Sequence, residues 1–163
     1  MYNVLFICTA NICRTPMAHY YLLHLLKQDG LADQFEVKSA GTWAIEGIPA
    51  AHFSQVVCKD HGIDASAHIS QPIDLPLMKA ADVILCMAIQ HKFDLCQIFP
   101  HFRSKIFTLK EYMREVTDDD YSIDDPYGRS IELYRETYEI ITGEIKRVYP
   151  ALKQNAKKKL NLL

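Results

Sequence analysis

Four short, largely apolar runs alternate along the chain with longer segments in which apolar residues recur at helical spacing. The runs predict β-strands at residues 4–7, 35–40, 82–87 and 105–109. The periodic segments predict helices at residues 17–28, 49–60, 90–98 and 130–149. Strands that alternate with helices are typical of a parallel sheet covered on both faces. The pattern therefore predicts an α/β fold, in which helices flank a doubly wound four-stranded parallel sheet.

Prolines refine the ends of two of these helices. Pro16 suits the first turn of a helix, because its missing N–H needs no partner there. The last helix is predicted to end before Pro150, since proline disrupts a helix interior. Residues 151–163, which include three consecutive lysines, are then predicted to form a basic C-terminal tail on a single domain spanning residues 1–163.

Composition narrows the classes of protein to which the chain can belong. Its 163 residues, 49% of them hydrophobic, suffice for one domain with a substantial core. The net charge is −2 and the basic residues are scattered apart from the lysine run, which does not favour a nucleic-acid partner. The N-terminal apolar run is too short for a membrane span or a signal peptide, although export without a signal would leave no such trace.

The five cysteines also carry information about location and metals. Their odd number and the absence of CxxC spacing argue against a disulfide framework and against a zinc site. We therefore expect a reducing, cytoplasmic environment and neither metal nor organic cofactor.

A thiol ends the first apolar run, and an arginine follows six positions later. The backbone between Cys8 and Arg14 must curl, so the N–H groups of residues 9–14 can converge on one anion at the positive end of the next helix. Arg14 supplies a planar fork that matches two phosphoryl oxygens. The same field favours a thiolate at Cys8, which is a nucleophile beside the bound phosphate. The competing interpretation is that Cys8 is a small buried apolar residue at a strand end.

Several segments resemble one enzyme family in the same order along the chain. The run Cys8-Thr9-Ala10-Asn11-Ile12-Cys13-Arg14-Thr15-Pro16 resembles the signature loop of the low-molecular-weight protein tyrosine phosphatases, whose pattern is Cys, five residues, Arg, then Ser or Thr. Further downstream, Asp125-Pro126-Tyr127 resembles the general-acid loop of that family. The intermediate matches are Ser39-Ala40-Gly41-Thr42, His61-Gly62-Ile63 and Leu85-Cys86-Met87. The resemblance covers nearly the whole chain.

The resemblance implies a phosphomonoesterase that acts on tyrosine-phosphorylated proteins and small aryl phosphates and releases inorganic phosphate. Cys8 would attack phosphorus, Arg14 would hold the equatorial oxygens, and Asp125 would protonate the leaving phenol before activating water. A turn aspartate beside proline is often functionally empty, and Asp124 is an adjacent competitor for the acid role. The remaining residues of the phosphate-binding loop would be Thr9, Ala10, Asn11, Ile12 and Cys13.

Other residues are expected to support this site. The hydroxyl of Thr15 would stabilise the nucleophilic sulfur, or cap the helix. By resemblance, Asn11 holds the tight backbone of the loop, aided by His68, which by itself would more often be a surface or core histidine. Trp43 and Tyr127 would form the walls of a slot that admits a phenyl phosphate, although an aromatic side chain in a loop can equally cap the core.

Cys13 lies close enough to the nucleophile in sequence to form a reversible disulfide with it. Such a bond would shield Cys8 from irreversible oxidation. The alternative is that Cys13 is a buried thiol with no redox role.

The chain departs from the family pattern at four positions. Ala10 replaces a glycine, so the loop must accept a methyl group with some backbone strain. Gly128 replaces an aromatic residue, Ala88 replaces an acidic one, and Gln71 stands near a basic position. These differences affect substrate preference and loop support more than the type of reaction.

Three other functions compete with tyrosine phosphatase activity. Arsenate reduction would need resolving thiols, for which Cys86 and Cys96 are the candidates, but their surroundings do not match such a pair. Protein-arginine phosphatases typically carry threonine at the position of Ile12, so Ile12 favours phosphotyrosine. A catalytically weak module that binds phosphate is the third alternative.

Overall fold

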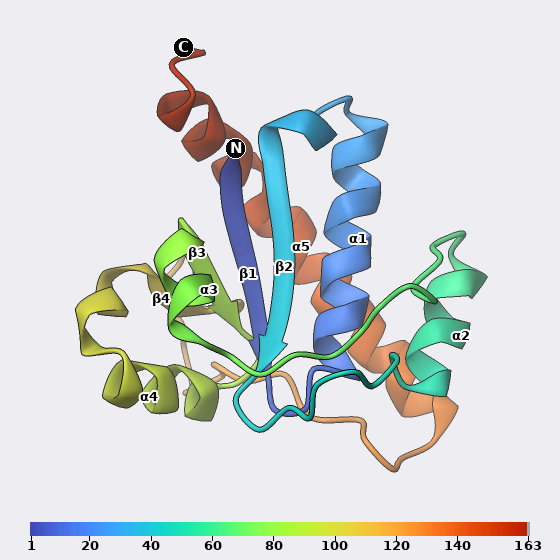
Figure 1. Ribbon diagram of the computed structural model, residues 1–163. Helices are drawn as coiled ribbons and strands as arrows, with labels where there is room; N and C mark the ends of the chain where they lie inside the picture. The colour runs from blue at the N-terminus through green and yellow to red at the C-terminus, as the bar shows by residue number, and fades with distance from the viewer. Residues whose placement is uncertain (163) are drawn as a thin grey trace.

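A computed structural model describes residues 1–162, and its strands form one parallel sheet. The strands are β1 (Tyr2–Cys8), β2 (Phe35–Gly41), β3 (Val83–Cys86) and β4 (Ile106–Thr108). They are arranged in the order β2-β1-β3-β4. Because parallel strands have their carboxyl ends at one edge, the loops that follow β1 and β2 gather at the lower end of the sheet in Figure 1.

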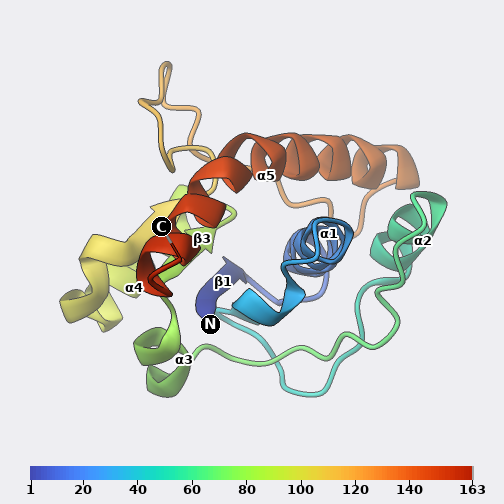
Figure 2. The same cartoon turned by 90° about the horizontal axis from the view of Figure 1, so that it is seen from above.

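Helices cover both faces of the sheet, so the predicted doubly wound α/β fold is confirmed (Figures 1 and 2). The α-helices are α1 (Arg14–Gln28), α2 (His52–Asp60), α3 (Leu75–Ala80), α4 (Ile89–Ile98) and α5 (Ile131–Lys159), and the 3-10 turns are η1 (Ala32–Gln34) and η2 (Pro100–Lys105). The core on one face is formed by α1, α2 and α5, and the core on the other face by α3 and α4. None of the helices described in residues 1–162 has the length and apolar character that crossing a bilayer requires.

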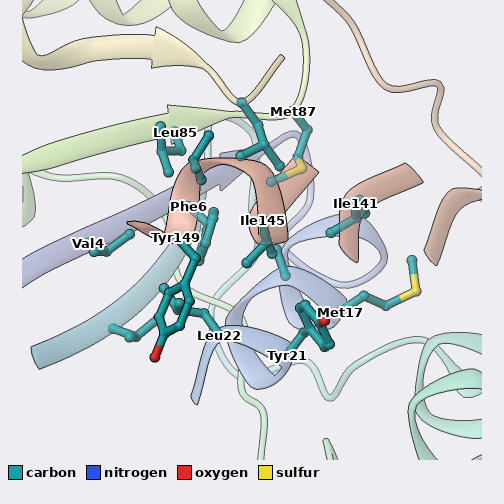
Figure 3. Close-up of a cluster of buried hydrophobic side chains, with 14 of the residues drawn as sticks. Val4, Phe6, Met17, Tyr21, Leu22, Leu85, Met87, Ile141, Ile145 and Tyr149 are labelled. Carbon is teal, nitrogen blue, oxygen red and sulfur yellow. The ribbon is translucent and has the colours of Figure 1, made fainter. Parts of the chain in front are cut away.

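The alternation of side chains along β1 decides which face receives the thiol. Val4 and Phe6 belong to the core beneath α1 and α5 (Figure 3), and Cys8 follows them at the same period of two. Leu5 and Ile7 belong to the opposite core, under α3 and α4. Both sets are buried, which explains the continuous apolar run of this central strand.

The prediction that the last helix ends at Pro150 and is followed by a basic tail is wrong. Helix α5 continues to Lys159, and Pro150 is exposed on its outer face. Proline removes one backbone hydrogen bond of the helix. That loss is offset because Leu152 and Ala156 are fully buried in the core. At the end of α5, Lys159 Nζ lies 2.7 Å from Asp82 Oδ2.

One other helix begins later than the sequence pattern predicts, and one short helix was not predicted. Helix α2 begins at His52 instead of residue 49, because Pro49 forms an isolated β-bridge with Ile69. The pattern also missed α3, a single short helix whose first turn is capped by Asp74, which accepts the Leu77 N–H at 2.8 Å. A helix of this length carries too few residues to show a periodic stripe.

We predict that Leu152→Ala lowers the free energy of unfolding by about 2–5 kcal/mol, because it removes a fully buried side chain from the α5 end of the core. Urea denaturation measures this change. Lys158→Ala is the matched control on the exposed side of the same helix end. If residues 151–159 were a solvated tail, both variants would be as stable as the wild type.

Candidate active site

The loop between β1 and α1 packs against the loop that follows β2. The N–H groups of Thr42 and Trp43 donate to the carbonyl oxygens of Cys8 and Thr9, at 3.0 and 2.9 Å. A Cβ atom at Gly41 would lie 2.3 Å from the Thr9 carbonyl oxygen. Glycine is therefore required at position 41, because the two loops approach so closely there.

Asn11 holds the curl of the loop between Cys8 and Arg14. Its φ of 59° lies in the left-handed region, which asparagine tolerates better than most residues. Its side-chain amide donates to the hydroxyls of Thr15 at 2.8 Å and Ser39 at 3.0 Å, and its Oδ1 accepts the Gln71 N–H at 2.9 Å. Its carbonyl accepts from His68 Nε2 at 2.6 Å. Several buried hydrogen bonds therefore hold a backbone conformation that is energetically unfavourable in isolation.

The sulfur of Cys8 lies at the base of this loop. Thr15 Oγ1 is 3.1 Å from Cys8 Sγ. Because the Thr15 oxygen already accepts a hydrogen bond from Asn11, its own proton is available to the sulfur. A hydroxyl that donates to sulfur favours the thiolate, the reactive form of cysteine.

Arg14 is buried and lines the same pocket as Cys8. Its Nη1 donates to the Ile123 carbonyl at 2.9 Å, and its Nη2 lies 3.4 Å from Asp125 Oδ2. Within residues 1–162, its buried Nε has no hydrogen-bond partner. An unpaired buried N–H of a cation is costly unless a ligand accepts from it.

Asp125 comes to the site on the segment that precedes α5. The Ile123 N–H donates to the Met87 carbonyl at 2.7 Å, which attaches this segment to the end of β3. Asp125 Oδ1 accepts the Tyr127 N–H at 3.1 Å, and its carboxylate is half-exposed. Asp125 lines the pocket above the loop, whereas Asp124 is absent from that lining. Of the two adjacent aspartates, Asp125 is therefore the one that reaches the pocket.

A pocket of about 500 Å³ opens above Cys8 and Arg14. Its walls are mostly apolar and are formed by Ile12, Trp43, Ile45, Ile48 and Tyr127. Trp43 and Tyr127 are 81% and 67% exposed, so these side chains rise from the surface around the mouth. Trp43 and Tyr127 were predicted from the sequence as walls of the slot, whereas Ile45 and Ile48 were not. In the sequence, the feature that indicates them is a pair of apolar residues in the loop after the carboxyl end of a strand.

The four departures from the family pattern have local explanations. Ala10 lies outside the left-handed region, so the expected strain at this position is wrong and Asn11 carries the positive φ instead. Gly128 has a φ of 71°, which side chains rarely adopt. Gln71 Nε2 donates to the Ser39 carbonyl at 3.0 Å, and Ala88 is the N-cap of α4. Gln71 therefore supports the Asn11 network directly.

The thiol of Cys13 faces a tyrosine. Its Sγ lies 3.3 Å from the hydroxyl of Tyr134. Burial raises the pKa of Cys13 to about 11, so its thiol is protonated at neutral pH. A disulfide between Cys13 and Cys8 stays a prediction.

Comparison with known proteins decides the family. The model of the family described as "Low molecular weight phosphotyrosine protein phosphatase" matches residues 3–159. The chain belongs to this family. A crystal structure of the low molecular weight protein tyrosine phosphatase from T. tengcongensis is 37% identical, with a TM-score of 0.84 over 93% of this chain and 99% of that one.

Relatives within the family carry two different names. The protein-arginine-phosphatase of Bacillus subtilis is 34% identical over 94% of this chain and 98% of its own length. The low molecular weight protein-tyrosine-phosphatase Ptp of Acinetobacter johnsonii is also 34% identical, over 83% of this chain and 87% of its own length. Overall sequence identity therefore does not decide whether this member of the low molecular weight phosphatase family acts on phosphotyrosine or on phosphoarginine.

Three histidines around the site of this phosphatase resist protonation. Burial is the largest cause of the lowered pKa in each case. The pKa values of His19 and His91 fall to about 4, and that of His68 is also lowered. The positive charge of Arg14 lowers the pKa of His91 further. In the unfolded chain a histidine titrates near 6.5. Protons therefore bind the unfolded chain first, and stability falls as pH drops from about 6.5 toward 4.

We predict that wild-type protein loses stability between pH 7 and pH 5, with about 2 kcal/mol of that loss coming from His91. Urea denaturation at the two pH values measures it. His91→Gln removes this part of the pH dependence, and His101→Gln, at an exposed position, leaves it unchanged. An identical pH dependence in wild type and His91→Gln would contradict the assignment.

Proposed function

We propose that the protein hydrolyses phosphotyrosine in proteins, and small aryl phosphates, through a cysteinyl-phosphate intermediate. The observation that carries this proposal is the Nε of buried Arg14, which has no partner within residues 1–162 and belongs to a residue that lines the same pocket as Cys8. Nε and Nη2 lie on the same side of a guanidinium and together match two oxygens of one phosphoryl group. The loop N–H groups of residues 9–14 supply the remaining donors.

In the first step, the Cys8 thiolate attacks phosphorus in line with the leaving phenol. The S–P bond forms while the bond between phosphorus and the phenolic oxygen breaks. Protonated Asp125 gives its proton to that oxygen, so tyrosine leaves as a neutral phenol. Arg14 stabilises the negative charge on the equatorial oxygens.

In the second step, the roles of acid and base reverse. Asp125, now a carboxylate, takes a proton from a water molecule that attacks phosphorus. The S–P bond breaks, inorganic phosphate is released, and the thiolate is restored. Thr15 stabilises the departing sulfur through its hydroxyl, 3.1 Å away.

The pocket walls favour a phenyl ring over a guanidinium. Ile12, Trp43, Ile45 and Ile48 offer apolar contact, and Asp125 is the one acidic residue in the lining formed by residues 1–162. A phosphoarginine side chain would bury N–H groups against these walls without partners. Phosphoarginine is nevertheless the second candidate substrate, because the B. subtilis relative is named for it.

The cysteine positions count against the arsenate alternative. Cys8 belongs to the core under α1 and α5, whereas Cys86 is buried in the core on the opposite face of the sheet. Burial raises the pKa of Cys86 well above its ordinary value, so it is a poor nucleophile for disulfide exchange. All five cysteines are free thiols, which suits the cytoplasmic location that we propose.

The position of Asp125 counts against the alternative of a binding module. Its carboxylate lies at the pocket beside the Arg14 guanidinium, where a leaving oxygen would emerge. Simple phosphate binding gains nothing from a carboxylate there, because two anions repel each other. Placement of an acid beside a phosphate trap therefore supports turnover.

We predict that the wild-type protein hydrolyses para-nitrophenyl phosphate in the presence of EDTA and that Cys8→Ser abolishes turnover, because serine is not ionised at neutral pH. Asp125→Asn lowers kcat by about 10²–10⁴-fold, since the leaving group loses its acid. Asp124→Asn is the matched control and keeps activity. No turnover by the reduced wild-type protein would overturn the proposed function.

We predict that wild type prefers a phosphotyrosine peptide to a phosphoarginine peptide, measured as the ratio of kcat/KM values. Ile12→Thr shifts this ratio toward phosphoarginine by about 10-fold, because it places a hydroxyl where a guanidinium would otherwise meet an apolar wall. Ile98→Thr, at an exposed position outside the pocket, makes the same change and leaves the ratio as it is in the wild type. Preference for phosphoarginine by the wild type would make the second candidate the correct one.

A further inference from the structure

A buried histidine from a second helix contacts the phosphate-binding loop. His91 lies in the first turn of α4 and is 4% exposed. Its Nε2 is 2.9 Å from Thr9 Oγ1, and its Nδ1 accepts the Ala88 N–H at 3.0 Å. Nothing in the sequence pattern pointed to this contact, because 82 positions separate the two residues.

The hydrogen bond from Ala88 decides which ring nitrogen carries the proton. A backbone N–H can only donate, so Nδ1 must be unprotonated. In the neutral ring the proton then lies on Nε2, which donates to Thr9 Oγ1. The ring is neutral at pH 7, because burial and the nearby Arg14 lower its pKa to about 4.

Asp94 and Asp125 act on the same ring in the opposite direction, since their charges favour the cation. Burial and Arg14 outweigh both carboxylates in setting the pKa. The direction of the hydrogen bond from His91 to Thr9 is therefore fixed at neutral pH.

Thr9 receives a second donor from the arginine of the site. Arg14 Nη2 lies 3.5 Å from Thr9 Oγ1. With donors from His91 and Arg14 directed at its oxygen, the hydroxyl proton of Thr9 must point away from both. In residues 1–162 that proton has no acceptor, and Thr9 lines the pocket above Cys8. An anion bound in this pocket would offer that proton an acceptor.

We propose that Thr9 donates its hydroxyl proton to a non-bridging oxygen of the bound phosphoryl group, and that His91 is the positioning residue that sets this direction. The proposal rests on the proposed function and adds a side-chain donor to the backbone N–H groups and Arg14. A donor held in place before the substrate arrives needs no reorganisation as negative charge builds on the oxygen. Its contribution is therefore larger in the transition state than in the bound substrate.

The first test replaces the hydroxyl. Thr9→Val keeps the shape of the side chain and is expected to raise the inhibition constant of inorganic phosphate, and to lower kcat/KM for para-nitrophenyl phosphate, by about 10- to 100-fold, the range of one hydrogen bond to a charged group. Thr9→Ser keeps the donor and most of the affinity and activity. Thr117→Val, at an exposed position, leaves both unchanged.

The second test addresses His91. His91→Leu removes the donor that orients the hydroxyl and lowers kcat more than it raises KM, whereas His91→Gln retains a donor and an acceptor and restores activity. In the double variant Thr9→Val/His91→Leu, the loss equals that of Thr9→Val alone, since both changes remove one interaction. His101→Leu is the exposed control for the same substitution.

The outcomes separate this inference from the proposed function. If Thr9→Val binds phosphate and turns over substrate as wild type does, the inference is wrong and the phosphatase assignment stands. If wild type binds phosphate in a Thr9-dependent way without turnover, the hydroxyl contact is supported and the proposed function fails. If the loss of activity in the double variant equals the sum of the losses in Thr9→Val and His91→Leu, expressed as free energies, the positioning role of His91 is overturned.

Discussion

The left-handed backbone of Asn11 is the constraint on which the site depends, because it sets the curl of the loop between Cys8 and Arg14. Such a conformation costs free energy in isolation and persists only where the surroundings enforce it. Here the enforcing groups come from three other segments: Ser39 on β2, the region of His68 and Gln71, and Thr15 on α1. The shape of the loop is therefore a tertiary property, although its residues are contiguous.

The parallel sheet explains why these segments meet. Strand β1 is central and ends at Cys8, beside Gly41 on one neighbour, and Ile7 pairs with Cys86 on the other. The loops after β1, β2 and β3 therefore begin at one edge of the sheet. The segment that carries Asp125 is attached to that edge through Ile123, which forms hydrogen bonds with both the end of β3 and Arg14. One residue thus couples the position of Asp125 to that of Arg14.

The site combines a rigid floor with exposed walls. Cys8, Asn11 and Arg14 are buried and bonded on several sides, whereas Trp43 and Tyr127 rise into solvent. A rigid floor suits a reaction whose phosphoryl chemistry is the same for every substrate, and catalysis by fixed donors requires it. Exposed walls can differ between relatives without disturbing that floor, which agrees with two substrate names within one family.

The sequence by itself predicted the order of the strands, four of the five α-helices described in residues 1–162, and the gathering of Cys8, Arg14 and Asp125 at one site, because each prediction rests on local patterns or short motifs. It could not show that α5 continues past Pro150, since burial of Leu152 and Ala156 outweighs a local helix breaker. It could not reveal Ile45, Ile48 or His91 either, because these residues reach the pocket or its loop only through the fold. Local sequence patterns show the backbone preference of each segment and the chemical groups that it contains. Contacts between distant segments, in contrast, are decided only when the sheet and its helices pack together.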